Sequence, residues 1–186
     1  MAESRILLDT NAYFRLAQSI RPLLTVSFGE QNYTLYVLKE LQDEYEKSPR
    51  LTNRFAWVNE PEFANNRNQR LALTPEEKTE IKRAYDFILD YVRNVHPGVS
   101  KVDVLGLAYA EQLGIPVITD DDEMRQAAKD YGIKTMKTLE LLKLMLECNH
   151  IDMPKVREIV AYWVYMKDTP KAFKADYKKL FGEDPP

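Results

Sequence analysis

The acidic residues of this sequence recur at positions that suit metal-assisted chemistry, directly after short apolar runs or in the first turn of a helical segment. They are Asp9, Glu40, Asp103 and the consecutive Asp120, Asp121 and Asp122. Carboxylates gathered in one cleft raise each other's pKa unless a cation neutralises them. Mg²⁺ and Mn²⁺ prefer such oxygen ligands and bridge them to substrate phosphates. The pattern therefore predicts a divalent-metal site suited to phosphoryl transfer.

Four apolar runs, each followed by a helical segment, are expected to position these acids. The runs cover residues 5–8, 33–38, 115–119 and 133–136. Repeated alternation of strand and helix predicts a mostly parallel sheet with helices on both faces, a three-layer α/β/α fold. Because ligands gather outside the carboxyl ends of parallel strands, we expect the acids to meet at one edge of the sheet. Residues 50–73 have weak periodicity and are expected to form a loop with helical pieces.

Some of the acids also have a purely structural explanation. Ser100 and Asp103 have the spacing of a capping box, and Thr74 with Glu77 shows the same pattern at another helix start. An acid in the first turn gains from the helix dipole without any function. Asp9 is harder to explain in this way, because a carboxylate at the end of an inner apolar strand has few structural duties.

Composition narrows the class of protein. The chain has 186 residues, 45% hydrophobic and 30% charged, and a formal net charge of -3. The sequence has no apolar run of the roughly 18 residues that cross a membrane, and its start lacks the pattern of a signal peptide, so a cytoplasmic protein with no membrane partner is expected. A single cysteine, Cys148, and two histidines supply a Cys/His zinc site poorly.

A basic stretch interleaved with aromatic residues is the second feature that could do chemistry. We expect its charges and rings to grip a nucleic acid by phosphate contact and stacking, although Trp57 and Phe55 could equally pack the loop onto the core. The candidates for binding are Arg50, Arg54, Arg67, Arg70 and Trp57.

The ordered motifs resemble the PIN domain family, the metal-dependent nuclease fold of toxin ribonucleases and several RNA-processing nucleases, over roughly residues 5–147. Residues 6–11, Ile-Leu-Leu-Asp-Thr-Asn, are similar to the opening strand of that family. Residues 37–41, Val-Leu-Lys-Glu-Leu, resemble the second motif. Ser100 to Asp103 and Val117 to Met124 resemble the third and fourth motifs.

The resemblance implies roles for individual residues. The metal-binding catalytic acids would be Asp9, Glu40, Asp103 and Asp121, with Glu123 as a variable additional ligand. Side chains that orient these acids or the attacking water would be Thr10, Asn11, Thr119, Asp120, Asp122 and Glu44. Two points stay open: Glu44 competes with Glu40 one helical turn later, and the register within Asp120 to Asp122 could slip by one.

The activity implied by the resemblance is Mg²⁺- or Mn²⁺-dependent hydrolysis of RNA without a covalent intermediate. The sequence itself does not distinguish RNA from DNA. A toxin of this type would have an antitoxin protein as partner. The rival interpretation is a PIN-like module that binds RNA or protein with weak or no catalysis.

The end of the chain departs from the strand-helix pattern. We expect residues 1–148 to form the PIN-like nuclease domain and residues 149–186 a C-terminal helical extension packed on the same domain. An apolar stripe runs from Val156 to Val164 and includes Trp163. It could pack onto the core, form a homodimer or receive a partner, and core packing is the commonest fate of such a stripe.

Overall fold

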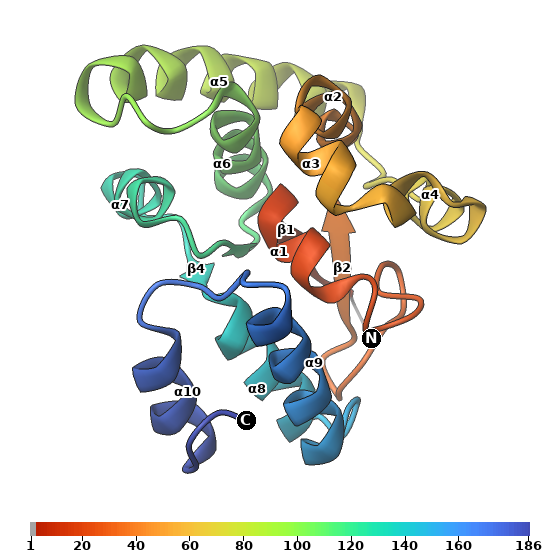
Figure 1. Cartoon of the computed structure of the whole chain (residues 1–186). Coiled ribbons are helices and arrows are strands. Elements are labelled where there is room, and N and C mark those ends of the chain that lie inside the picture. The colour runs from red at the N-terminus through yellow and green to blue at the C-terminus, as the bar shows by residue number, and fades with distance from the viewer. Residues whose placement is uncertain (1–2) are drawn as a thin grey trace.

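The computed structural model describes residues 3–186, and its centre is a four-stranded parallel sheet (Figure 1). The strand order is β2-β1-β3-β4, with β1 between β2 and β3. The strands are β1 (Ser4–Leu8), β2 (Tyr33–Val37), β3 (Val117–Ile118) and β4 (Thr135–Met136). The register pairs Leu8 with both Val37 and Ile118, so three strands end level with Asp9. The predicted parallel α/β fold is therefore confirmed.

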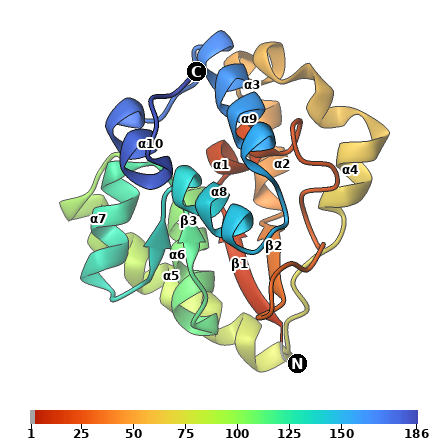
Figure 2. The same cartoon turned by 90° about the horizontal axis from the view of Figure 1, so that it is seen from below.

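Alternate residues of each strand point to opposite faces, and each face is covered by helices. Ile6 and Leu8 of β1 are buried in one apolar cluster, while Leu7 between them is buried in the other. The second cluster holds α5 (Pro75–Val95), α6 (Lys101–Leu113) and α7 (Asp122–Asp130). The first includes α1 (Thr10–Leu16), α8 (Thr138–Glu147) and α9 (Met153–Tyr165). Figures 1 and 2 show these two helical layers on either side of the sheet, as predicted.

The two later strands are shorter than the apolar runs that encode them. The run 115–119 supplies only Val117 and Ile118 to the ladder, and the run 133–136 supplies only Thr135 and Met136. Gly114, which adopts φ +64°, closes α6 in the left-handed conformation that glycine tolerates, so residues 115–116 serve as the turn into β3. Both helix starts with predicted capping boxes, at Thr74 and Ser100, have them.

Short helices follow one another from residue 40 to residue 67, so the region 50–73, expected to be a loop with helical pieces, is mostly helical up to Arg67. They are α2 (Glu40–Lys47), α3 (Pro49–Arg54), the 3₁₀ turn η1 (Ala56–Asn59) and α4 (Pro61–Arg67). Ser48 caps α3 by accepting from the Leu51 amide, and a proline follows the cap of both α3 and α4. Prolines at these positions favour helix starts, which explains why weak periodicity still yields helices. Figures 1 and 2 place α4 and α7 on opposite sides of the molecule.

The last two helices contribute to the main core. Asp152 caps α9, and the apolar stripe of this helix is buried with α1 and α8. Trp163 is 1% exposed and donates from Nε1 to the Arg15 carbonyl across 2.7 Å. The final helix, α10 (Phe173–Phe181), buries Phe173 and Tyr177 in the same cluster. Among residues 3–186, no helix is both long and apolar enough to cross a membrane.

Candidate active site at the carboxyl ends of the strands

Asp9 lies at the end of the central strand β1 and caps the helix that follows. Its Oδ1 accepts from the Ala12 amide across 2.6 Å. Loss of surrounding water raises the pKa of Asp9 to about 7, and the charges of Asp103 and Asp120 act in the same direction. The Thr119 hydroxyl opposes this rise. A carboxylate that resists ionisation among other carboxylates is typical of a site that binds a cation.

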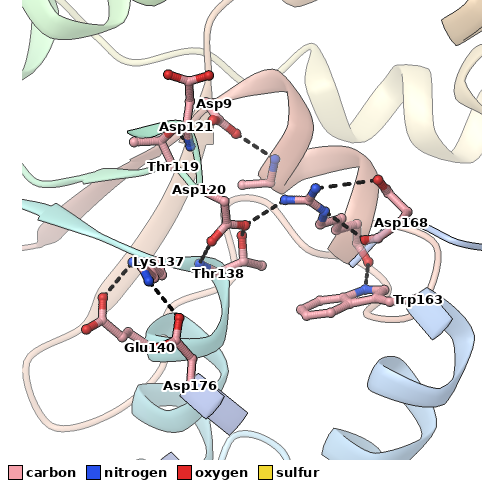
Figure 3. Close-up of polar contacts among 12 residues, drawn as sticks. Asp9, Thr119, Asp120, Asp121, Lys137, Thr138, Glu140, Trp163, Asp168 and Asp176 are labelled. Carbon is pink, nitrogen blue, oxygen red and sulfur yellow. Dashed lines mark hydrogen bonds and ion pairs between the residues drawn. The ribbon is translucent and has the colours of Figure 1, made fainter. Parts of the chain in front are cut away.

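Asp121 caps α7 directly after β3. Its Oδ1 accepts from the Met124 amide at 2.7 Å, and its own amide donates to Thr119 Oγ1 at 3.1 Å. Thr119 is fully buried, and its hydroxyl lowers the pKa of Asp9 on the neighbouring strand end. Figure 3 shows Asp9, Thr119 and Asp121 side by side. Thr119 therefore lies between the backbone of Asp121 and the carboxylate of Asp9.

Asp103 is the third position of the capping box that starts α6. Its Oδ2 accepts from the Ser100 amide at 3.1 Å, while Ser100 Oγ accepts from the Asp103 amide at 3.1 Å. Burial raises the pKa of Asp103, and the charges of Glu44 and Asp121 raise it further. Asp103 therefore does cap α6, as its spacing from Ser100 predicts. The cap uses only Oδ2 of this carboxylate, and within residues 3–186 its Oδ1 accepts no hydrogen bond.

Glu40 and Glu44 lie one turn apart on α2 and differ in their contacts. Glu44 accepts from Thr10 Oγ1 across 2.5 Å, beside Asp9. Glu40 Oε2 is buried without a donor among the described residues, and Oε1 is 3.8 Å from Lys39 Nζ. One oxygen of Glu44 therefore already accepts a hydrogen bond within the protein, whereas Glu40 has a buried oxygen with no donor.

Asp120 is fully engaged by the protein, as Figure 3 shows. Its Oδ2 accepts from Arg15 at 2.6 Å and from Thr138 Oγ1 at 2.5 Å, and its Oδ1 accepts from the Thr138 amide at 3.1 Å. Arg15 also pairs with Asp168, in the segment between α9 and α10. These contacts make Asp120 an anchor between β3, α8 and the end of the chain.

A hollow of about 210 Å³ lies beside Asp9. It is lined by Asp9, Asn11, Arg15, Asp120, Asp121, Asp122, Thr169, Pro170 and Lys171. Lys171 extends over this acidic edge, with its Nζ 2.9 Å from Asp122 Oδ2, and this contact lowers the pKa of Asp122. The exposed side chain of Asn11 borders the same hollow. Residues 169–171, outside the sheet, thus form one wall of the site.

Glu123, in the first turn of α7, lies against the loop before α6. Its carboxylate occupies the space that a Cβ would need at Gly98. A larger hollow, of about 1090 Å³, is lined by residues of α9 and of the loop after α1 and contains none of the predicted acids.

The residues predicted to bind nucleic acid differ in burial and in the groups that they contact. Arg54 donates to the Met166 carbonyl at 2.7 Å and lies 3.6 Å from Asp168, so it holds the C-terminal segment. Trp57 is 8% exposed and packs against Phe63 and Phe14. This placement leaves Trp57 no free face for a base. Arg50 and Arg70 are exposed, and Arg67 is buried.

Arg15, Thr138 and Lys171 are site residues that the sequence did not indicate. Arg15 is 105 residues from Asp120 along the chain, and no local pattern marks such a pairing. Lys171 belongs to a basic tail, and no local pattern shows that this tail passes beside the start of α7.

The fold is a parallel α/β domain with acids at the carboxyl edge of its sheet. A model of the PIN domain matches residues 6–130, about two-thirds of the chain, so the chain belongs to the PIN domain family. PIN domains are generally nucleases that use divalent metal ions. No curated protein sequence gives a match to the chain.

The donor set fits a divalent metal ion. Its oxygens are those that Mg²⁺ and Mn²⁺ prefer, and the unsatisfied Glu40 Oε2 is an atom that a cation would stabilise. In the part of the chain that is described, no three His, Cys, Asp or Glu side chains surround one point as a finished metal site. Binding an ion would therefore require the acids to rotate toward it.

Proposed function

We propose that the chain is a metal-dependent endoribonuclease that hydrolyses RNA with the help of Mg²⁺ or Mn²⁺. The observation that carries this proposal is the convergence of three acids that start three different helices at one edge of the sheet. Asp9 and Asp103 line one hollow, and Asp9 and Asp121 line another. The proposed metal ligands are these three acids and Glu40, with Glu123 as an additional acid.

The chain's own groups would hold the reacting parts in place. A bound divalent ion would lower the pKa of a water molecule and neutralise charge on the phosphate. Caps fix the backbones of Asp9, Asp103 and Asp121 and leave an oxygen of Asp103 and of Asp121 for the ion. Lys171 at the edge of the hollow supplies a cation for a substrate phosphate.

RNA cleavage in the presence and absence of metal tests the proposal. Purified protein is incubated with a single-stranded RNA in Mn²⁺, in Mg²⁺ and in EDTA, beside the Asp9→Asn variant. We expect fragments with metal and none with EDTA or with Asp9→Asn. A DNA strand of the same sequence shows which nucleic acid is preferred. No cleavage of either strand in Mn²⁺ would rule out the nuclease.

The rival function is a catalytically silent PIN-like module that binds RNA or a protein. The observation that favours it is that Asp9, Asp103 and Asp121 each cap a helix, a structural role that needs no catalysis. RNA binding without cleavage in the same assay would select it.

We also propose, from the family resemblance, that the chain is a toxin with an antitoxin partner. Exposed apolar side chains on α5, Phe87 and Val95, are 70% and 49% exposed and offer a surface for an antitoxin or a second copy. A small adjacent gene whose product blocks the cleavage would support the toxin role, and sedimentation would show whether the chain forms a homodimer.

A further inference from the structure

A small basic hollow lies beside α2 and α4, on the side of the molecule away from α7 (Figure 1). Its volume is about 190 Å³, and it has three cationic side chains and no acidic one in its lining. The cations are Lys39, Arg67 and Arg70, and the polar groups between them are Gln42, Asn59 and Asn68. A hollow of this composition selects an anion.

Arg67 is the decisive residue, because its charge is buried without a carboxylate. The residue is 5% exposed. Its guanidinium donates to the Tyr13 hydroxyl at 3.1 Å and to Gln42 Oε1 at 3.0 Å, both neutral groups. No acidic side chain among residues 3–186 pairs with it. Burying a charge is costly unless an opposite charge compensates it.

Arg15 provides the comparison within the same chain. Its side chain is similarly enclosed, yet it pairs with two carboxylates, Asp120 and Asp168. The fold thus supplies acids to one enclosed guanidinium and leaves the other facing a hollow with two further cations. The missing counter-charge of Arg67 is best supplied from outside the chain.

We propose that this hollow is a binding site for a phosphate group of the nucleic-acid strand. The proposal rests on the nuclease function, since it assigns the hollow to the same substrate. Arg67 supplies planar, bidentate donors of the kind that suit phosphate oxygens, and Lys39 and Arg70 add mobile charge at the mouth. Gln42, which accepts from Arg67, orients the guanidinium.

The position of the hollow relative to the acids supports this assignment. Helix α2 carries Glu44, which contacts Thr10 beside Asp9, and also Gln42, which lines the hollow. Arg67 contacts Tyr13, on the same short helix as Thr10. Leu38 and Leu41 line both this hollow and the hollow that contains Asp9 and Asp103. The two sites therefore adjoin, and a strand bound at the acids can continue toward Arg67.

Binding of inorganic phosphate in EDTA tests the site without any cleavage. Thermal melting is followed against phosphate concentration at constant ionic strength, with chloride as reference. Because Arg67 is buried, its exposed neighbours are changed instead, to Lys39→Gln and Arg70→Gln. Arg93→Gln, an exposed arginine on α5, is the control with the same charge change.

Saturable stabilisation of the wild type and of Arg93→Gln is expected, with phosphate affinity at least ~5-fold weaker in each hollow variant. Absence of saturable stabilisation, or equal affinity in all four proteins, would overturn the site.

A short single-stranded RNA, again in EDTA, separates a strand phosphate from a free anion. The logarithm of the RNA association constant decreases linearly with the logarithm of the salt concentration. The magnitude of this slope should be smaller by about 0.7 for each phosphate that a hollow variant no longer neutralises. Unchanged RNA affinity and slope, with weakened binding of inorganic phosphate, would overturn the assignment to the strand. Neither binding assay needs metal. A wild-type protein that does not cleave RNA in Mn²⁺ would therefore contradict the proposed nuclease function and leave the phosphate site to be judged by these two assays.

Discussion

The Arg15 guanidinium donates to Asp120 across 2.6 Å, joining a helix at the start of the chain to the strand end beside the acids. The same guanidinium donates to the Asp168 carbonyl at 3.1 Å. Arg15 thus fixes the segment whose Lys171 borders the site. Arg15, which belongs to none of the predicted motifs, therefore holds one wall of the acidic edge in place.

Replacing Arg15 should destabilise the fold strongly. In Arg15→Met the Asp120 charge remains enclosed, its side chain being only 7% exposed, so unfolding free energy should fall by about 3 kcal/mol. Adding Asp120→Asn should recover part of the loss. Arg157→Met, which removes an exposed pair with Glu183, should cost less than about 1 kcal/mol. Urea unfolding measures the free energy of unfolding of all three variants. An equal decrease for Arg15→Met and Arg157→Met would show that the enclosed pair with Asp120 stabilises the fold no more than an exposed pair does.

Asp121→Asn should separate capping from catalysis. Asparagine caps a helix about as well as aspartate, so unfolding free energy should change by less than about 0.5 kcal/mol. Cleavage should fall at least ~10-fold, because the charge of a metal-binding oxygen is removed. Asp152→Asn changes a matched cap on α9, far from the site, and should leave cleavage intact.

The same experiment decides the register of the three aspartates. If Asp122→Asn abolishes cleavage and Asp121→Asn does not, the ligand is one position later than proposed. The contacts argue against Asp120, whose oxygens accept from Arg15 and Thr138.

Strand polarity explains why the meeting of the strand-end acids could be predicted from sequence. Asp9 and Asp121 follow neighbouring parallel strands, so their meeting needs only the parallel order, and the Ser100 capping box fixes where α6 begins. Both are local sequence patterns, and each determines where a carboxylate lies relative to the sheet.

Long-range pairing and burial explain what could not be predicted. Trp57 lies in an aromatic cluster with Phe14 and Phe63, and nothing within residues 50–73 shows that its partners come from α1 as well as α4. Arg67 was predicted to contact nucleic acid, and no local pattern shows that it is buried with Tyr13 and Gln42 as its acceptors. Both depend on how separate segments meet.

Glu40 and Glu44 can be distinguished by matched glutamine variants. Glu40→Gln removes the charge from a buried oxygen that lacks a donor, so Mn²⁺ affinity should fall at least ~10-fold. Glu44→Gln keeps an acceptor for Thr10 and should lower affinity less. Electron paramagnetic resonance of free Mn²⁺ measures both. The reverse order would make Glu44 the second metal-binding acid.

The raised pKa of Asp9 predicts how stability changes with pH in the metal-free protein. Its folded pKa of about 7 lies above the usual 3.8, so the folded state holds a proton that the unfolded state has released. This contribution is complete below about pH 4 and is lost as pH rises toward about 7. In EDTA, unfolding free energy should therefore fall over this window in the wild type and more weakly in Asp9→Asn. Asp86→Asn, an exposed acid on α5, should follow the wild type. Mn²⁺ should restore stability near neutral pH, since it binds the ionised acids. Parallel curves for wild type and Asp9→Asn would show that Asp9 ionises as an ordinary carboxyl.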